Sequence, residues 1–165
     1  MRIVPVREEL IPGFHAAVDS VARERRFLGF IASPPIESTY TFVRTLLANG
    51  GLQLLAITDA EEVVGWCDIA RLPWTGLRHV GRLGMGLLAP FRGQGHGRRL
   101  AVAAIDAARE KGVERIELEV FASNLVAIKL YETLGFQREG IKRRFRKLDG
   151  QYEDSVIMAL LSEDA

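Results

Sequence analysis

The chain has 165 residues, of which 48% are hydrophobic and 26% are charged, and its formal net charge is +1. This length predicts one domain over residues 1–165 with a proper core, and the composition is ordinary for a globular protein. The near-neutral charge gives no argument for nucleic-acid or membrane partners, and no apolar run approaches the roughly 20 residues of a membrane-spanning helix. The first residues are not typical of a signal peptide, and the single cysteine, Cys67, excludes an internal disulfide framework. We therefore expect a cytoplasmic protein.

The first half of the chain predicts a strand, a helical region, a second helix and two strands. Pro12 lies near the start of the helical region, where proline is tolerated. The prolines of the loop 32–36 cannot continue a helix, and Asn49-Gly50-Gly51 ends the next one. The expected elements are strand 3–6, one or two helices over 7–30, helix 36–48 and strands 52–58 and 63–71.

The second half alternates strands and helices more sharply. Gly112 and Gly135 each follow a helical pattern and supply its end, and Asn124 is a good N-cap. The Asp149-Gly150 pair predicts a hairpin turn between the last two strands. The expected elements are strand 79–88, helix 100–108, strand 115–120, helix 124–134 and strands 137–147 and 152–161. Together these elements predict an α/β domain with a mixed sheet.

A glycine-rich turn joins the strand 79–88 to the following helix, with the sequence Arg-Gly-Gln-Gly-His-Gly over residues 92–97. Glycines let the main chain approach a ligand closely, and the first N–H groups of a helix have no partner within it. Such a turn favours a phosphate or pyrophosphate group. The spacing fits neither a Walker loop nor a dinucleotide fingerprint, but it fits Arg/Gln-x-x-Gly-x-Gly/Ala through Arg92, Gly95 and Gly97. The alternative is a turn that needs glycine for its geometry only.

This turn resembles the acetyl-CoA loop of the GCN5-related N-acetyltransferases, the GNAT superfamily. The stretch Val-Phe-Ala-Ser-Asn-Leu-Val-Ala-Ile-Lys-Leu-Tyr-Glu-Thr-Leu-Gly-Phe over residues 120–136 looks like the second motif of that family. The tail after it looks like the branch that acetylates small amines, amino acids or protein N-termini. The resemblance implies a mixed, mostly antiparallel sheet of six to seven strands with about four helices, splayed between the fourth and fifth strands.

The resemblance also implies a cosubstrate, acetyl-CoA, and no metal. The fourth strand would hold the pantetheine arm near Leu87 through its main chain, and the turn would hold the pyrophosphate. The family often has proline where this chain has Ala89, so the register of the loop stays open by one residue. The implied cofactor-binding residues are Met85, Leu87, Ala89, Arg92, Gly93, Gln94, Gly95, His96, Gly97, Arg98 and Asn124.

Two residues are candidates for proton transfer. Tyr131 lies about two helical turns after Asn124, on the same helix face. The resemblance implies that its hydroxyl protonates the departing thiolate; the alternative is a tyrosine wedged against the sheet. Asn124 serves either as a helix cap alone or also as a pantetheine ligand. Glu119 is a candidate base, although a solvated strand face explains it equally well, and Asp68 or a chain of water molecules are alternatives.

We therefore expect an N-acetyltransferase that transfers an acetyl group from acetyl-CoA directly to a primary amine of a small molecule, such as an amino acid. The alternatives are a protein N-terminus as acceptor, or a catalytically silent CoA-binding sensor. An arginine, Arg82, stands where many relatives have an acidic residue, which favours the sensor, whereas Tyr131 argues against it. The basic run 142–147 indicates an exposed hairpin or recognition of an acidic substrate, rather than RNA binding. An exposed edge of the terminal strand pair would allow a homodimer.

Overall fold

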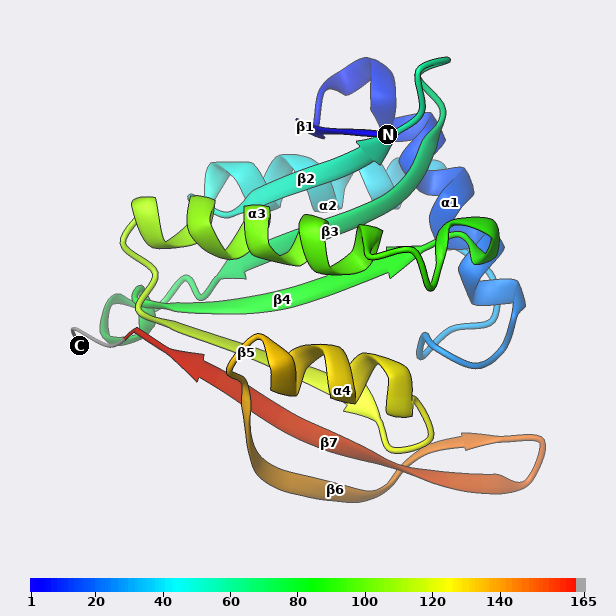
Figure 1. Cartoon of the computed structure of the whole chain (residues 1–165), viewed down its shortest axis with the longest axis vertical. Coiled ribbons are helices and arrows are strands. Elements are labelled where there is room, and N and C mark those ends of the chain that lie inside the picture. The colour runs from blue at the N-terminus through cyan, green and yellow to red at the C-terminus, as the bar shows by residue number, and fades with distance from the viewer. Residues whose placement is uncertain (163–165) are drawn as a thin grey trace.

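The computed structural model describes residues 1–162, and seven strands form one sheet in the order β1-β2-β3-β4-β5-β7-β6 (Figure 1). Neighbouring strands are antiparallel except β4 and β5, which are parallel. The strands are β1 Arg2–Pro5, β2 Leu52–Ile57, β3 Val63–Arg71, β4 Val80–Leu87, β5 Arg115–Phe121, β6 Gln137–Leu148 and β7 Gln151–Leu161. The predicted α/β architecture with a mixed, mostly antiparallel sheet is confirmed.

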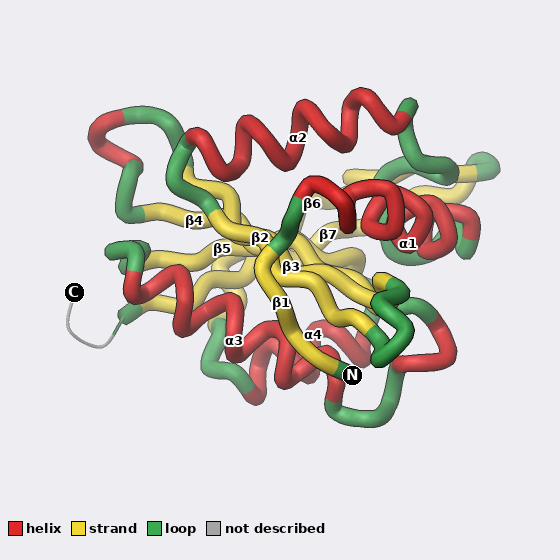
Figure 2. The backbone as a smooth tube through the Cα atoms, turned by 90° about the horizontal axis from the view of Figure 1, so that it is seen from above, coloured by secondary structure: helices red, strands yellow, loops and turns green. Residues whose placement is uncertain are grey.

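Four helices cover the sheet, two on each face: α1 Ile11–Arg23, α2 Ile36–Ala48, α3 His96–Glu110 and α4 Leu125–Thr133. Figure 2 shows α1 and α2 on one face and α3 and α4 on the other. Helix α1 ends at Arg23, so the prediction of helix as far as Phe30 is wrong. The chain reverses at Arg25, whose φ is +59°, and folds back so that the Ser33 N–H donates to the Asp19 carboxylate at 2.8 Å.

Each face of the sheet has its own core. The first core packs the sheet against α3 and α4 and contains Leu100, Ile116 and Met158. The second core packs it against α1 and α2 and contains Phe14 and Trp66. Because successive strand residues point to opposite faces, the strand β5 places its apolar residues in the first core and its acidic residues on the α1–α2 face. The apolar set is Ile116, Leu118 and Val120, and the acidic set is Glu117 and Glu119.

The strands β4 and β5 pair over only three residues each. The last pair joins Arg82 to Glu117, after which β4 runs on to Leu87 and β5 to Phe121 without pairing to each other. A gap therefore opens between the two strands, and one edge of β4 has free main-chain groups there. This confirms the predicted splay between the fourth and fifth strands. None of the helices in residues 1–162 combines the length and apolar character needed to cross a membrane.

Candidate active site

The glycine-rich turn leaves β4 and opens α3, as the sequence predicts. Gly93 and Gly95 have φ values of +71° and +79°, in the left-handed region that favours glycine. A Cβ atom at either position would meet no other atom within 4 Å, so the turn faces open space. His96 begins α3, and its Nδ1 atom is buried without a hydrogen-bond partner among the described residues. Unpaired N–H groups, open space and an orphaned ring nitrogen fit a pyrophosphate group at this turn.

The other predicted cofactor residues fall around this turn. The side chains of Met85 and Leu87 both approach Gly97, at 3.7 Å and 3.3 Å from its ideal Cβ position. This contact packs the first turn of α3 against the end of β4. Ala89 and Arg98 are exposed, and the Gln94 amide donates to the carbonyl of Pro90 at 2.7 Å. The structure therefore brings the loop residues together as the resemblance implies.

Arg92 is the exception, because its guanidinium points away from the open side of the turn. Its Nε donates to the Leu87 carbonyl at 2.8 Å, and its two Nη atoms donate to the Glu24 carboxylate at 2.7 and 2.5 Å. The guanidinium also lies 4.8 Å from the centroid of the Phe27 ring. The hydrogen bonds from Arg92 lower the pKa of Glu24 below its usual value. Arg92 therefore joins the end of α1 to the turn, and any part it takes in binding a cofactor acts through the shape of that turn.

Two glycines of β4 serve packing. A Cβ atom on Gly86 would lie 2.3 Å from the Trp66 ring, so glycine at this position makes room for the indole. A Cβ atom on Gly84 would lie 3.3 Å from the Asp68 carboxylate. Both contacts lie on the α1–α2 face, where the Trp66 indole and the Asp68 carboxylate take the space that side chains at these two positions would fill.

Helix α4 presents Asn124 and Tyr131 as predicted. The Asn124 Oδ1 accepts from the Ala127 N–H at 3.2 Å, which confirms its role as a helix cap. Tyr131 is 7% exposed and packs in the first core, with its ring centroid 5.6 Å from that of Phe136. Burial raises the pKa of the Tyr131 hydroxyl, and no described residue hydrogen-bonds to it. The hydroxyl is therefore protonated and has no partner of its own among the described residues, so it can donate a hydrogen bond.

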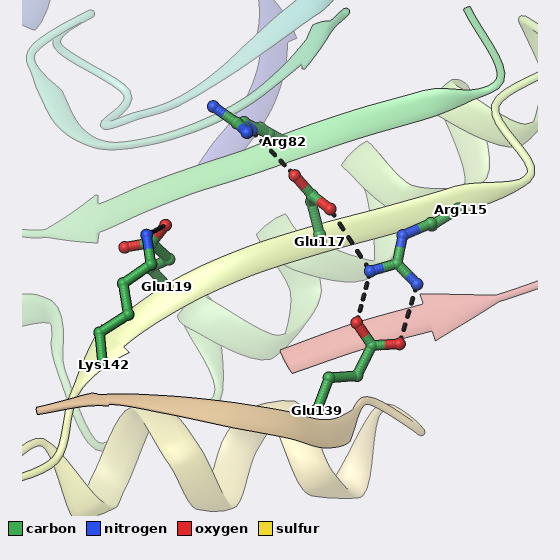
Figure 3. A network of polar contacts seen from close by, with 6 residues as sticks. All are labelled: Arg82, Arg115, Glu117, Glu119, Glu139 and Lys142. Atoms are coloured by element: carbon green, nitrogen blue, oxygen red, sulfur yellow. Dashed lines mark hydrogen bonds and ion pairs between the residues drawn. The ribbon is translucent and has the colours of Figure 1, made fainter. Parts of the chain in front are cut away.

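Glu119 lies on the opposite face, two residues beyond the last β4–β5 pair. Figure 3 shows its carboxylate in contact with the Lys142 ammonium, which comes from β6. Nearby, Arg82 donates to Glu117 at 2.9 Å, so the arginine at the position where many relatives have an acid is neutralised. Arg115 completes this network by binding Glu139 at 2.5 Å. Glu119 therefore lies on the α1–α2 face of the sheet and Tyr131 on the α3–α4 face.

A second carboxyl group lies on the same face of the sheet as Glu119. Asp68 on β3 pairs with Gly84 of β4, and extending the β4–β5 register places Glu119 level with that glycine. Asp68 is 8% exposed, and burial raises its pKa to about 7. Directly across from it on β2 is Gln53, 2% exposed, whose amide nitrogen and oxygen both lack a partner among the described residues. The sheet therefore carries a buried, incompletely satisfied polar pair beneath α1 and α2.

A comparison with known protein families identifies the family of this chain. The model described as "Acetyltransferase (GNAT) family" matches residues 15–136. The chain belongs to the acetyltransferase (GNAT) family. The acetyl donor of this family is acetyl-CoA, so the predicted cosubstrate and enzyme class are confirmed at that level. Within residues 1–162 no group of three or more metal-ligating side chains is placed to hold an ion.

Several curated relatives of this acetyltransferase carry a specific name. "[Ribosomal protein bS18]-alanine N-acetyltransferase" of Haemophilus ducreyi is 30% identical over 119 residues, which cover 70% of this chain and 79% of the relative. The enzyme of the same name from Escherichia coli K12 is 44% identical over 70 residues, which cover 42% and 47%. An uncharacterized N-acetyltransferase of Bacillus subtilis is 36% identical over 83 residues. The chain spans about half the length of these last two relatives.

Solved structures share the fold of this acetyltransferase almost completely. Ribosomal-protein-alanine N-acetyltransferase from Brucella melitensis superposes with a TM-score of 0.90 at 23% identity, over 98% of this chain and 99% of the other. A phosphinothricin acetyltransferase from Sinorhizobium meliloti, solved with acetyl-CoA, gives 0.91 at 16% identity, over 98% and 89%. At these identities the likeness establishes the fold alone.

Sequence reasoning missed three features of the acetyltransferase site. The pairing of Arg92 with Glu24 and of Lys142 with Glu119 joins residues far apart in the chain, and no local pattern signals either pair. The unpaired amide of Gln53 was also missed. The only signal for it in the sequence is that Gln53 is a lone polar residue in an apolar strand. Cys67, the single cysteine, is fully buried.

Proposed function

We propose that this acetyltransferase acetylates the α-amine of a protein or peptide N-terminus, acting as one domain over residues 1–165. The observation that carries the proposal is the gap between β4 and β5, with Glu119 on one face of the sheet and Tyr131 on the other. The relatives named for an alanine N-terminus of a ribosomal protein support this class of acceptor. They give no support to the small-molecule acceptor that we expected first.

Acetyl-CoA, when bound, supplies an activated acetyl thioester. The main-chain N–H groups of the turn Gly93–Gly97 would hold its pyrophosphate, and the free edge of β4 near Leu87 would hold the pantetheine arm. Main-chain N–H groups aimed at a developing oxyanion contribute on the order of a few kcal/mol each. Asn124 would add a contact beside its capping role.

Two side chains would move protons at the gap. An acceptor amine arrives as an ammonium ion and must lose a proton before it can attack. The Glu119 carboxylate, at the α1–α2 face, would take that proton directly or through water. The buried Tyr131 hydroxyl would donate a proton to the leaving group from the opposite face. The two groups lie on opposite faces of the sheet. Glu119 would therefore take the proton from the amine while Tyr131 gives one to the leaving thiolate, and the two side chains would not compete for the same proton.

The charge around the acceptor side supports a preference within this class. Three cations of β6 have no ion-pair partner within residues 1–162: Arg143, Arg144 and Lys147. The charged groups of Arg144 and Lys147 lie 5.1 and 5.0 Å from the centroid of the Tyr152 ring. These unpaired cations favour peptides with acidic residues after the first few positions. The same cations repel a strongly basic acceptor.

The test is a panel of acceptors assayed by thiol release: free amino acids, short peptides with free N-termini, and the same peptides with blocked N-termini. We expect turnover with free N-termini and none with blocked ones. Glu119→Gln should lower kcat about 100-fold. Glu117→Gln, on the same strand and face, is the matched control and should keep most of the activity. Faster turnover of single amino acids than of peptides would overturn the proposed acceptor.

The silent sensor rests on the missing acid at position 82, where Arg82 pairs with Glu117. It makes one clear prediction of its own. A sensor would bind acetyl-CoA with saturation yet release no thiol with any amine of the panel.

A further inference from the structure

The contact between Lys142 and Glu119 places a primary ammonium of the chain itself against the candidate base. Lys142 lies on β6, at the edge of the sheet, and its side chain reaches over β7 to β5 (Figure 3). Both side chains are partly open to solvent, with 41% and 39% exposure. The ammonium therefore reaches its partner from the side on which an external acceptor amine would arrive.

No other lysine is placed in this way. The chain has four lysines, Lys111, Lys129, Lys142 and Lys147. Lys142 alone among them forms an ion pair with a carboxylate of residues 1–162. Lys147 lies on the same strand, five residues further on, and its ammonium faces the Tyr152 ring instead. The pairing with Glu119 is therefore specific to one position of the basic run.

The segment that carries Lys142 is irregular. The register between β6 and β7 shifts between Lys142 and Arg146, and Arg144 within this bulge has a φ of +52°. A bulge bends its strand and re-aims the side chains next to it. The Phe145 ring lies 4.9 Å from the Lys142 ammonium and holds it over the α1–α2 face. The local backbone thus directs this lysine toward the gap.

We propose that Lys142 is an acceptor for the enzyme's own reaction, so that the chain acetylates itself at this side chain. The inference rests on the proposed function, in which Glu119 is the base. The Lys142 ammonium passes a proton to Glu119, and the free amine forms a bond to the acetyl carbonyl carbon of acetyl-CoA. The carbon–sulfur bond breaks, and the sulfur takes a proton from the Tyr131 hydroxyl. The nitrogen gives up its second proton, which returns to the Tyr131 oxygen through water, and Glu119 releases its proton to solvent. The products are Nε-acetyl-lysine and coenzyme A.

Self-acetylation would change the acceptor site. An acetylated lysine has no charge, so it no longer pairs with Glu119. Before acetylation, the Lys142 ammonium and an external ammonium compete for the same carboxylate. The unmodified enzyme therefore binds an acceptor peptide more weakly than an enzyme that lacks the lysine charge.

The first experiment incubates the purified full chain with acetyl-CoA and no acceptor, and follows intact mass and peptide maps with time. We expect the first acetyl group at Lys142, at a first-order rate that does not depend on enzyme concentration. Lys142→Arg should remove this product, Glu119→Gln should slow it at least tenfold, and Lys147→Arg should leave it unchanged. Acetyl groups spread evenly over the four lysines, or an equal rate in Glu119→Gln, would overturn the proposal.

The second experiment needs no acetyl-CoA. Calorimetry compares the affinity of an acceptor peptide for the wild type and for Lys142→Met, and we expect severalfold tighter binding to the variant. Equal affinities would contradict competition at Glu119. If free N-termini are acetylated while Lys142 stays unmodified, only this inference fails. If Lys142 is acetylated and no peptide of the panel is, the proposed acceptor class fails while the assignment of Glu119 stands.

Discussion

The two sides of the gap in this acetyltransferase are built in different ways. The cofactor side is one continuous run of chain, in which β4, the glycine turn and α3 present mainly main-chain groups. The acceptor side is assembled from side chains that lie far apart in the sequence. Arg25, just after α1, binds Asp149 of the β6–β7 turn at 2.6 Å, and Arg146 donates to the Arg25 and Leu28 carbonyls at 3.3 and 3.4 Å. One side depends on backbone shape, and the other on long-range polar contacts.

A single segment links the two sides. Glu24 and Arg25 are neighbours in the chain, yet the first binds Arg92 of the cofactor turn and the second binds Asp149 of the hairpin. Changes on the cofactor side should therefore act on acetyl-CoA binding, and changes on the acceptor side on the acceptor.

Gly95→Asp should abolish acetyl-CoA binding, a loss of at least 1000-fold, equivalent to about 4 kcal/mol. The variant strains a left-handed position and puts a side chain and a negative charge where the phosphates bind. Calorimetric titration with acetyl-CoA and with free coenzyme A measures the effect. Gly112→Asp is the matched control, because Gly112 has a φ of +80° with open space around it at the other end of α3. If Gly95→Asp bound acetyl-CoA with wild-type affinity, the turn would have a structural role only.

Asp68 should make the free energy of unfolding depend on pH. Its pKa is raised from 3.8 to about 7 in the folded protein, so the fold favours the protonated form. The contribution of Asp68 is complete below its unfolded pKa and is lost as the pH rises from about 4 to 7, at a cost on the order of 4 kcal/mol. Urea denaturation at several pH values should therefore show stability falling over this range.

Asp68→Asn should flatten that slope, because the amide does not titrate. Asp106→Asn, at an exposed position of α3, should keep it. The carboxyl groups whose pKa values are lowered, such as those of Glu24 and Glu139, lose their contribution to stability as the pH falls below about 5, so they overlap only the acid end of this window. An unchanged slope in Asp68→Asn would show that the buried carboxyl has found a partner in the folded protein.

Tyr131→Phe should lower kcat about 100-fold, which corresponds to roughly 2.7 kcal/mol, and leave the KM for acetyl-CoA nearly unchanged. The ring and its packing against Phe136 are kept, and only the hydroxyl is lost. Tyr152→Phe, at an exposed position of β7, should behave as the wild type. If Tyr131→Phe turned over at the wild-type rate, the hydroxyl would be a packing group of the core and not the acid.

The contrast between the two sides also explains what could be predicted from the sequence. The turn, Asn124 and Tyr131 lie within short stretches whose spacing reflects the local backbone, so the order of strands and helices and the cofactor side followed from them. The contacts of Glu24, Arg25 and Lys142 depend on which strands meet in space, and a single sequence carries no signal for them. The helix α1 was predicted too long for the same reason, since its end is fixed by tertiary contacts of residues 24–33.

Arg25→Ala should raise the KM for the acceptor peptide a few-fold and leave acetyl-CoA binding unchanged. The side chains of Arg25 and Asp149 are 42% and 74% exposed, and such surface pairs contribute roughly 0.2–1 kcal/mol. The expected effect is therefore small, and the test is whether it is confined to the KM for the acceptor. Arg23→Ala, which removes the exposed pair with Asp19 within α1, should change neither constant. Exchanging the charges in Arg25→Asp with Asp149→Arg should restore part of the lost acceptor affinity. A rise in the KM for acetyl-CoA in Arg25→Ala would mean that the segment transmits changes to the turn through Glu24 and Arg92, and that the two sides of the gap are coupled.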